Sequence, residues 1–442
     1  MHIELLEDLI ENVKALKSLR TFGRVSATDN GQVRVTGLTE LAKLGDQVRL
    51  YINDDTTLRG EVIQICDDYI CIMPDGDLTG LQLNTKVELF GQMQIAPHDS
   101  WLGRLLDANA EPMDGKPLHT SRHARPLFNP PPDAALRKGF GPRLETGCYA
   151  LNTVLPLVAG QRLGLFAGSG VGKSTLLGTL VKNVSCDVVV MALIGERGRE
   201  VRHFTDTVLG PEGMKNCVVV AATSDRSALE RRRCAWTAMT IAEHFRDAGK
   251  SVLFVADSIT RFAEAHREVA SSAGEIPVLR GHPPSTAQMI TSLCERAGPG
   301  TEGSGDITAV LSVLVQGSDM EEPIADILRG VLDGHIVLDR EIAERGRYPA
   351  INLLKSVSRS LPAAASDEEN NLIKLVRKYV SYYEENVLMV RSGLYTPGTD
   401  AELDLALKVW PDLDGYLGTV NTGSHQDNFD RLKLIFRRAG II

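Results

Sequence analysis

A run of small residues around one lysine carries the most specific chemistry in this sequence. An apolar segment, Arg162–Phe166, leads into a glycine-rich turn that ends at Lys173 and Ser174, and a helical stretch follows over Leu176–Val181. Small residues let the backbone curl so that its amide N–H groups and the N-terminus of the next helix point at a polyphosphate. Lys173 then reaches the β- and γ-phosphates, and the Ser174 hydroxyl coordinates Mg²⁺. The pattern predicts an ATP–Mg²⁺ site whose phosphate-binding residues are Gly168, Ser169, Gly170, Val171, Gly172, Lys173, Ser174 and Thr175.

One position departs from the usual form of this loop, because Ala167 stands where the first glycine is expected. Alanine keeps the side chain small, and the order of strand, loop and helix is intact. The alternative to a nucleotide site is a glycine-rich turn that carries a surface lysine.

Two acidic residues at strand ends are candidates for the hydrolytic chemistry, which needs a metal-supporting acid and a group that orients water. Asp257 ends the apolar run Val252–Asp257 and has the form expected of the acid that supports Mg²⁺. Glu196 follows the predicted strand Asp187–Ile194, and ligands of open α/β sheets bind at the carboxyl ends of the strands. Glu196 is therefore either the group that polarises the attacking water or a solvated acid in a charged loop, and these residues alone leave both open.

Three consecutive regions of the chain differ in their sequence pattern, and together they predict an α/β protein with an N-terminal β-barrel and a C-terminal helical domain. Short alternating segments with turn pairs at Asn30-Gly31 and Asp75-Gly76 predict a barrel over residues 22–94. Apolar strands that alternate with helices predict a P-loop domain with a mostly parallel sheet over 95–361, entered through an extended strap around the proline cluster Pro130–Pro132. Residues 362–442 are predicted to be helical. The expected strands of the sheet are Arg162–Phe166, Asp187–Ile194, Cys217–Ala221, Ser251–Ala256, Ile307–Val315 and His335–Leu338, and the expected late helices are Glu368–Arg391, Ala401–Trp410 and Asn428–Arg438.

Residues 1–21 have the apolar spacing of an amphipathic helix. Its apolar positions are Leu5, Leu6, Leu9, Ile10, Val13, Leu16 and Leu19. Such a helix either packs on its own domain or docks on a partner, and the spacing leaves both open.

Composition excludes some classes of function. The chain has 442 residues and a formal net charge of −9, which argues against a general nucleic-acid binder. Its seven cysteines are scattered and show no zinc-ligand spacing, as expected of reduced structural thiols in the cytosol. No apolar run is long enough to span a bilayer, so we expect a cytoplasmic protein or one attached peripherally to a membrane.

The segment Gly195–Val201, taken with the P-loop, resembles the catalytic subunits of rotary ATPases, and more closely the type III export ATPases of the bacterial flagellum and injectisome. The resemblance covers nearly the whole chain. Further segments that carry it, in order, are Leu102–Asp107, Pro112–Gly115, Leu165–Ser174, Pro283–Ser285, Glu295–Gly298, Pro323–Asp326 and Leu332–Leu338. Two segments depart from the family pattern: Asn352 stands where aspartate is usual, and Asn109–Glu111 lacks a glycine.

This resemblance implies roles for five side chains. Glu196 matches the catalytic glutamate, Arg197 an arginine beside the γ-phosphate, and Asp257 the acid that supports Mg²⁺. Arg359 matches the arginine finger that one subunit inserts into the site of its neighbour, and Tyr348 matches the aromatic residue packed on adenine.

The resemblance also implies partners and a cellular task. It implies a ring, a homohexamer, that hydrolyses ATP to energise the export of flagellar proteins at the inner membrane. Its expected partners are a stator-like regulatory protein at the N-terminal helix, a stalk protein in the ring centre, export chaperones and substrates at the C-terminal domain, and the export gate; no nucleic acid is expected. Four alternatives stay open: an injectisome ATPase, the catalytic β-type subunit of a rotary ATP synthase, a non-catalytic nucleotide-binding subunit, and a ring-shaped RNA translocase.

Overall fold

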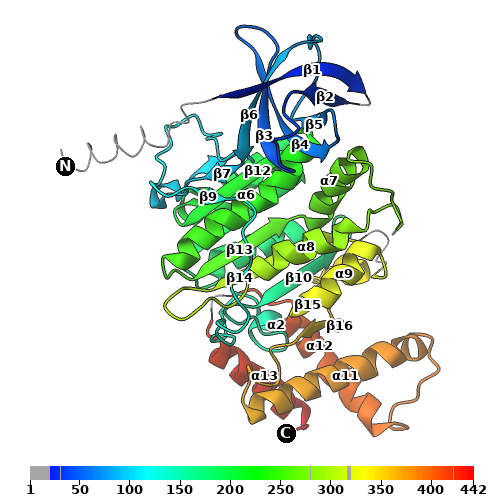
Figure 1. The fold of residues 1–442 in the computed structure, drawn as a ribbon. Coiled ribbons are helices and arrows are strands. Elements are labelled where there is room, and N and C mark those ends of the chain that lie inside the picture. Colours follow the sequence, from blue (N-terminus) through cyan, green and yellow to red (C-terminus); the bar gives the residue numbers. More distant parts are fainter. Residues whose placement is uncertain (1–19, 30, 279, 316–319, 422) are drawn as a thin grey trace, which may run out of the picture.

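The computed structural model describes residues 20–29, 31–278, 280–315, 320–421 and 423–442. A barrel, a sheet covered by helices, and a group of C-terminal helices follow one another along the molecule (Figure 1). The helix predicted over residues 1–21 lies outside the described residues except for its last two, and Thr21 already begins the first strand.

The N-terminal unit is a closed six-stranded barrel, as predicted. Its strands pair in the order β1-β2-β5-β4-β3-β6. Alternation along β2 sends Val33 and Val35 into the barrel core and leaves Arg34 between them facing outward. The strand bounds are β1 (Thr21–Asp29), β2 (Gln32–Thr36), β3 (Asp46–Tyr51), β4 (Thr57–Ile65), β5 (Ile70–Pro74) and β6 (Lys86–Gln92).

Buried ion pairs join the barrel to helix α6 (Ala228–Asp247) of the central domain. Arg232 Nη2 lies 2.5 Å from Glu61 Oε1 of β4. Arg233 Nη1 lies 2.9 Å from Asp75 Oδ2, and its second nitrogen lies 3.5 Å from Glu61 Oε2. Both arginines and Glu61 are buried, so each charge depends on its partner for stabilisation.

The segment between the barrel and the sheet is the extended strap that the prolines predicted, with only short elements. These are β7 (Gln94–Ile95), a 3₁₀ turn (Asp99–Trp101), β8 (Leu105–Leu106) and β9 (Arg125–Pro126). The two residues of β8 add an edge strand to the main sheet beside β12 (Cys217–Thr223), an element not predicted from the sequence.

The central sheet has eight strands in the order β16-β15-β10-β14-β13-β11-β12-β8. All neighbours are parallel except β15 and β16, which are antiparallel. Along β10, Leu163 and Leu165 pack into the core shared with the C-terminal helices, whereas Phe166 packs under α6 to α9. The strands are β10 (Arg162–Ala167), β11 (Val188–Glu196), β12 (Cys217–Thr223), β13 (Val252–Asp257), β14 (Ile307–Leu314), β15 (Gly334–Leu338) and β16 (Ile351–Ser358).

Helices lie on both faces of this sheet, as its parallel connections require. Besides α6, they are α2 (Tyr149–Asn152), α3 (Lys173–Asn183), α4 (Gly198–His203), a π-helical turn (Phe204–Leu209), α5 (Gly210–Met214), α7 (Ile259–Ser272), α8 (Ser285–Arg296), α9 (Pro323–Val331) and α10 (Arg340–Glu344).

Three helices form the C-terminal unit: α11 (Asp367–Arg391), α12 (Ala401–Leu417) and α13 (His425–Ala439). The predicted end of the second helix at Trp410 is wrong, because α12 continues for seven residues through Pro411. Leu413, Tyr416 and Leu417 are buried in the main core, and this packing outweighs the hydrogen bond that proline removes. Within the described part of the chain, no helix combines the length and the apolar character needed to cross a membrane.

Candidate active site

The candidate site lies where the carboxyl ends of β10, β11 and β13 meet. These strands run parallel, and β13 pairs with β11 so that Asp257 lies opposite Leu193, three residues before Glu196. On the other side of β13, β14 separates it from β10, which ends at Ala167 beside Leu314. The topology therefore brings the phosphate loop and both candidate carboxylates to one edge of the sheet.

The phosphate loop has the strand–turn–helix geometry that the sequence predicted. Gly170 and Gly172 have φ angles of 77° and 88°, in the left-handed region that favours glycine. Gly172 caps α3, which begins at Lys173, so the free amides of its first turn and the hydroxyls of Ser174 and Thr175 lie at the helix start. Ala167 is the buried last residue of β10 rather than part of the turn, which explains why alanine is accepted there.

Lys173 lies between the two acidic side chains. Its ammonium donates a hydrogen bond to Asp257 Oδ1 and lies 4.0 Å from Glu196 Oε1. The buried hydroxyl of Ser312, on β14, donates to the same oxygen of Asp257 at 2.5 Å. These contacts hold the Asp257 carboxylate at a fixed orientation beside the phosphate loop.

The environment of Glu196 favours its protonated form. Burial is the main cause, followed by the negative charge of Asp257, and together they raise the pKa of Glu196 from 4.5 to about 7 despite the opposing charge of Lys173. A carboxyl group with a pKa near the working pH is suited to accept a proton from water. Its geometry and pKa therefore fit the water-polarising role better than that of a solvated surface acid.

Two arginines, Arg197 and Arg261, are neighbours of Glu196, one in sequence and one in space. Arg197 is 69% exposed and its nearest acidic partner is Glu200, at 3.7 Å, so it is not part of the buried cluster. Arg261, in the first turn of α7, packs its stem over Gly195 and pairs with Glu264 at 2.7 Å, and its charge interacts with Glu196. The sequence analysis missed Arg261, although its place four residues after Asp257, on the helix that follows β13, was a usable signal.

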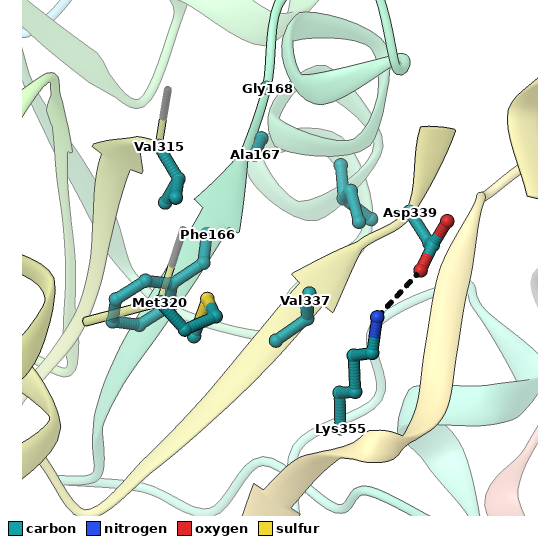
Figure 2. A pocket seen from close by; sticks show the side chains of 9 residues that line it. Phe166, Ala167, Gly168, Val315, Met320, Val337, Asp339 and Lys355 are labelled. Atoms are coloured by element: carbon teal, nitrogen blue, oxygen red, sulfur yellow. Dashed lines mark hydrogen bonds and ion pairs between the residues drawn. The ribbon is translucent and has the colours of Figure 1, made fainter. Parts of the chain in front are cut away.

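Tyr348 lies beside the phosphate loop. It is half exposed, and a Cβ atom placed on Gly172 would be 3.1 Å from its ring. An apolar hollow opens next to Ala167 and Gly168, between the ends of β10, β14 and β15 (Figure 2). It is lined by Phe166, Ala167, Gly168, Val315, Met320, Val337, Leu338, Asp339 and Lys355.

The rim of this hollow explains one departure from the family pattern. Lys355 Nζ lies 3.3 Å from Asp339 Oδ2, as Figure 2 shows, and Asn352 Nδ2 donates to that same oxygen at 3.0 Å. An aspartate at position 352 would place a second carboxylate against Asp339. An amide fits this place because it donates a hydrogen bond.

Arg359 lies far from the site of its own chain. Because β16 is antiparallel to β15, Ser358 pairs with Gly334, whereas Ile351 pairs with Leu338, which pairs with Ala167. Arg359 is thus at the amino end of β10, about five residues, or roughly 16 Å, from the phosphate loop. Its side chain is exposed and donates to the Arg329 carbonyl at 3.0 Å.

The metal-binding capacity of this edge is small without a nucleotide. In the described ranges, no group of three or more His, Cys, Asp or Glu side chains could hold a metal ion. Ser174 and Asp257 supply one hydroxyl and one carboxylate beside the phosphate loop, a set that suits Mg²⁺ when phosphate oxygens and water complete the octahedron.

Comparison with known proteins assigns the family. Residues 147–358 match the model of the ATP synthase alpha/beta family, nucleotide-binding domain, and residues 365–420 match the T3SS EscN ATPase C-terminal domain. The chain is 42% identical to the flagellum-specific ATP synthase of Caulobacter vibrioides, over 93% of this chain and 94% of that one. It is 40% identical to the type 3 secretion system ATPase of Xanthomonas euvesicatoria, over 91% of both chains.

Solved structures give the same answer. The assembled ATPase EscN of enteropathogenic E. coli superposes with a TM-score of 0.86 at 36% identity, over 93% of this chain and 99% of that one. EscN in complex with its central stalk EscO superposes with a TM-score of 0.85, at the same identity and coverage. The chain therefore belongs to the ATP synthase alpha/beta family, in the branch of the flagellar and type III secretion ATPases.

Proposed function

We propose that this chain hydrolyses ATP in a ring of identical subunits, a hexamer, and thereby energises the export of flagellar proteins. We infer the ring from the position of Arg359, which lies roughly 16 Å along the sheet from the phosphate loop of its own chain. An arginine stabilises the negative charge of the transferring phosphoryl group, and Arg359, too far from its own site to do so, would do so in the site of a neighbour.

The residues of the site take the following roles in this proposal. Lys173 neutralises the β- and γ-phosphates, and Asp257, fixed by Ser312, supports Mg²⁺ together with Ser174. Glu196 orients the attacking water and accepts its proton. Mg²⁺, when bound, neutralises charge on the phosphate oxygens.

Three further residues complete the site. Arg197, exposed on the chain alone, reaches the γ-phosphate from the loop that follows β11. Tyr348 packs on the adenine, and Arg359 enters from the adjacent subunit.

The partners and place of the ring are part of the same proposal. EscN was solved in complex with a central stalk, and a stalk protein in the ring centre is proposed here by analogy. Residues 1–21 would dock a stator-like protein, and the C-terminal helices would face export chaperones and substrates. The ring would work at the cytoplasmic side of the inner membrane, against the export gate.

The test is Mg²⁺-dependent ATPase activity against protein concentration for the wild type, Glu196→Gln, Arg359→Ala and the control Arg340→Ala, whose arginine is also exposed. We expect activity to rise steeply with concentration, to vanish on chelation, to fall by 10³-fold or more in the first two variants, and to be unchanged in the control.

Mixing the two inactive variants tests donation in trans. In a ring mixed at random, roughly a quarter of the interfaces pair an intact Glu196 with an intact Arg359, so activity should return to that fraction. Failure of mixing to restore turnover would refute donation in trans, and ATP binding without turnover by the wild type would favour the non-catalytic alternative.

A further inference from the structure

The residue before Tyr348 links the nucleotide site to the C-terminal helices. Arg347 is almost fully buried, and its guanidinium bonds in two directions. Nη2 donates to the carbonyl of Ile351 at 2.6 Å, which closes the short loop that contains Tyr348. Nη1 pairs with Asp414 Oδ1 of α12 at 2.9 Å.

The end of the same helix packs directly on this loop. A Cβ atom on Gly418, the residue that caps α12, would lie 3.1 Å from Arg347 Cγ and 3.5 Å from the carbonyl oxygen of Tyr348. Gly418 has an ordinary helical φ of −86°, so lack of space, not backbone conformation, favours glycine here. Tyr348 in turn lies against Gly172 of the phosphate loop.

The charges around the loop agree with this arrangement. Glu384 of α11 is half-buried, which raises its pKa, and the positive charges of Arg345 and Arg347 oppose that increase. Carboxylates from α11 and α12 therefore face the basic segment that precedes Tyr348.

We propose that the Arg347–Asp414 pair positions Tyr348 for the purine base, so that the affinity for the base depends on where α12 lies. The inference rests on the proposed packing of Tyr348 on adenine. Arg347 and Asp414 are positioning residues here, because they would act on the base through Tyr348. By thermodynamic linkage, a partner that moves α12 changes ATP affinity, and ATP binding changes the affinity for that partner by the same factor.

The experiment compares two ligands that share phosphates and differ in the base. Dissociation constants of Mg²⁺–ATP and Mg²⁺–tripolyphosphate are measured by calorimetry on the full chain carrying Glu196→Gln, so that ATP is not turned over, for two matched pairs of variants. Asp414→Asn is paired with Asp412→Asn, an exposed carboxylate on the same helix. Gly418→Ala is paired with Gly415→Ala, where a new Cβ meets nothing within 4 Å.

We expect Asp414→Asn and Gly418→Ala each to weaken ATP binding roughly five- to tenfold, the lower end of typical coupling between sites, and to leave tripolyphosphate binding unchanged. Their partners should match the chain carrying Glu196→Gln alone for both ligands, and Asp414→Glu should recover part of the loss. Equal weakening of both ligands would mean a general loss of structure and would overturn the inference, as would ATP binding unchanged in both Asp414→Asn and Gly418→Ala.

Tyr348→Ala separates this inference from the proposal beneath it. If that variant loses the preference for ATP over tripolyphosphate while Asp414→Asn keeps it, the coupling is wrong and the adenine contact stands. If Tyr348→Ala keeps the preference for ATP, Tyr348 does not pack on adenine, and both the proposed adenine contact and the coupling that rests on it are wrong.

Discussion

Removing the charge of Glu196 should make the protein inactive and more stable. Its carboxyl has a pKa of about 7 in the folded chain, against 4.5 for an ordinary glutamate, mainly because it is buried and faces Asp257. The folded chain therefore holds more protons than the unfolded chain between about pH 4.5 and pH 7, and its stability falls as pH rises through that window. Above pH 7 the full penalty is present, at most about 3 kcal/mol at roughly 1.4 kcal/mol for each tenfold change. Glu196→Gln removes this penalty and keeps the shape of the side chain.

Thermal unfolding without nucleotide at pH 4.5, 6 and 8 measures this effect. We expect the thermal midpoint of the variant to match that of the wild type at pH 4.5 and to exceed it increasingly as pH rises, by up to about 3 °C at pH 8. The gain is an upper limit because Lys173 loses an acidic neighbour at 4.0 Å. Glu212→Gln is the control, since that side chain is 84% exposed and should change the midpoint little. A midpoint difference that is the same at every pH, or a loss at pH 8, would refute the assignment of Glu196 as a strained carboxyl.

Two further changes test the geometry around the site. Gly172→Ala should lower the free energy of unfolding by roughly 1–2 kcal/mol, because the φ of Gly172 is 88° and the new Cβ would be 3.1 Å from the Tyr348 ring. Gly168→Ala is the control and should lower it less, since the nearest atom to its new Cβ is 3.8 Å away. Equal thermal midpoints of the two variants would contradict this prediction. Arg233→Ala leaves the Asp75 carboxylate without its partner and leaves Glu61 with Arg232 alone, and it should cost about 3–5 kcal/mol, seen as a lower midpoint and faster proteolysis of the barrel. Arg202→Ala is the control, since the Arg202 side chain is 86% exposed in a surface pair with Asp206, and it should change the free energy of unfolding by less than about 1 kcal/mol. A loss of stability in Arg202→Ala as large as that in Arg233→Ala would argue that burial is not the cause of the Arg233 effect.

Much of the architecture could be predicted because it depends on local patterns. Alternating apolar and polar residues with turn pairs predicted the barrel, and apolar runs predicted the bounds of the six central strands to within one or two residues. The phosphate loop was predictable for the same reason, since strand, small residues, lysine and helix are consecutive in the chain. Asp257 and Glu196 were predictable as strand-end acids, and parallel pairing then had to bring them together.

What could not be predicted depends on residues that are distant in sequence. The helix α12 passes through Pro411 because its last turn packs on a core formed by other segments. The position of Arg261 near Glu196 follows from its stem lying over Gly195, a contact across 66 positions. Asparagine in place of the usual aspartate at position 352 is explained by Asp339, which lies beside it in the fold and accepts its hydrogen bond. In each case a tertiary contact decided the outcome, and no local pattern records it.

The strand β16 lies between two residues that we propose to act at ATP sites, Tyr348 and Arg359. It begins directly after the Tyr348 loop and ends directly before Arg359, so one strand joins the proposed base contact of its own site to the arginine proposed to serve the neighbouring site. Arg377 of α11 donates to the carbonyls of Leu353 and Ser356 and holds the strand to the helical domain. Both ends of β16 pair with β15, Ser358 with Gly334 and Ile351 with Leu338, while the register between them is irregular and the strand bulges there. In the proposed ring we therefore expect occupancy of one site to change the position of Arg359 toward the next site, and α11 and α12 hold β16 and the Tyr348 loop that form this link.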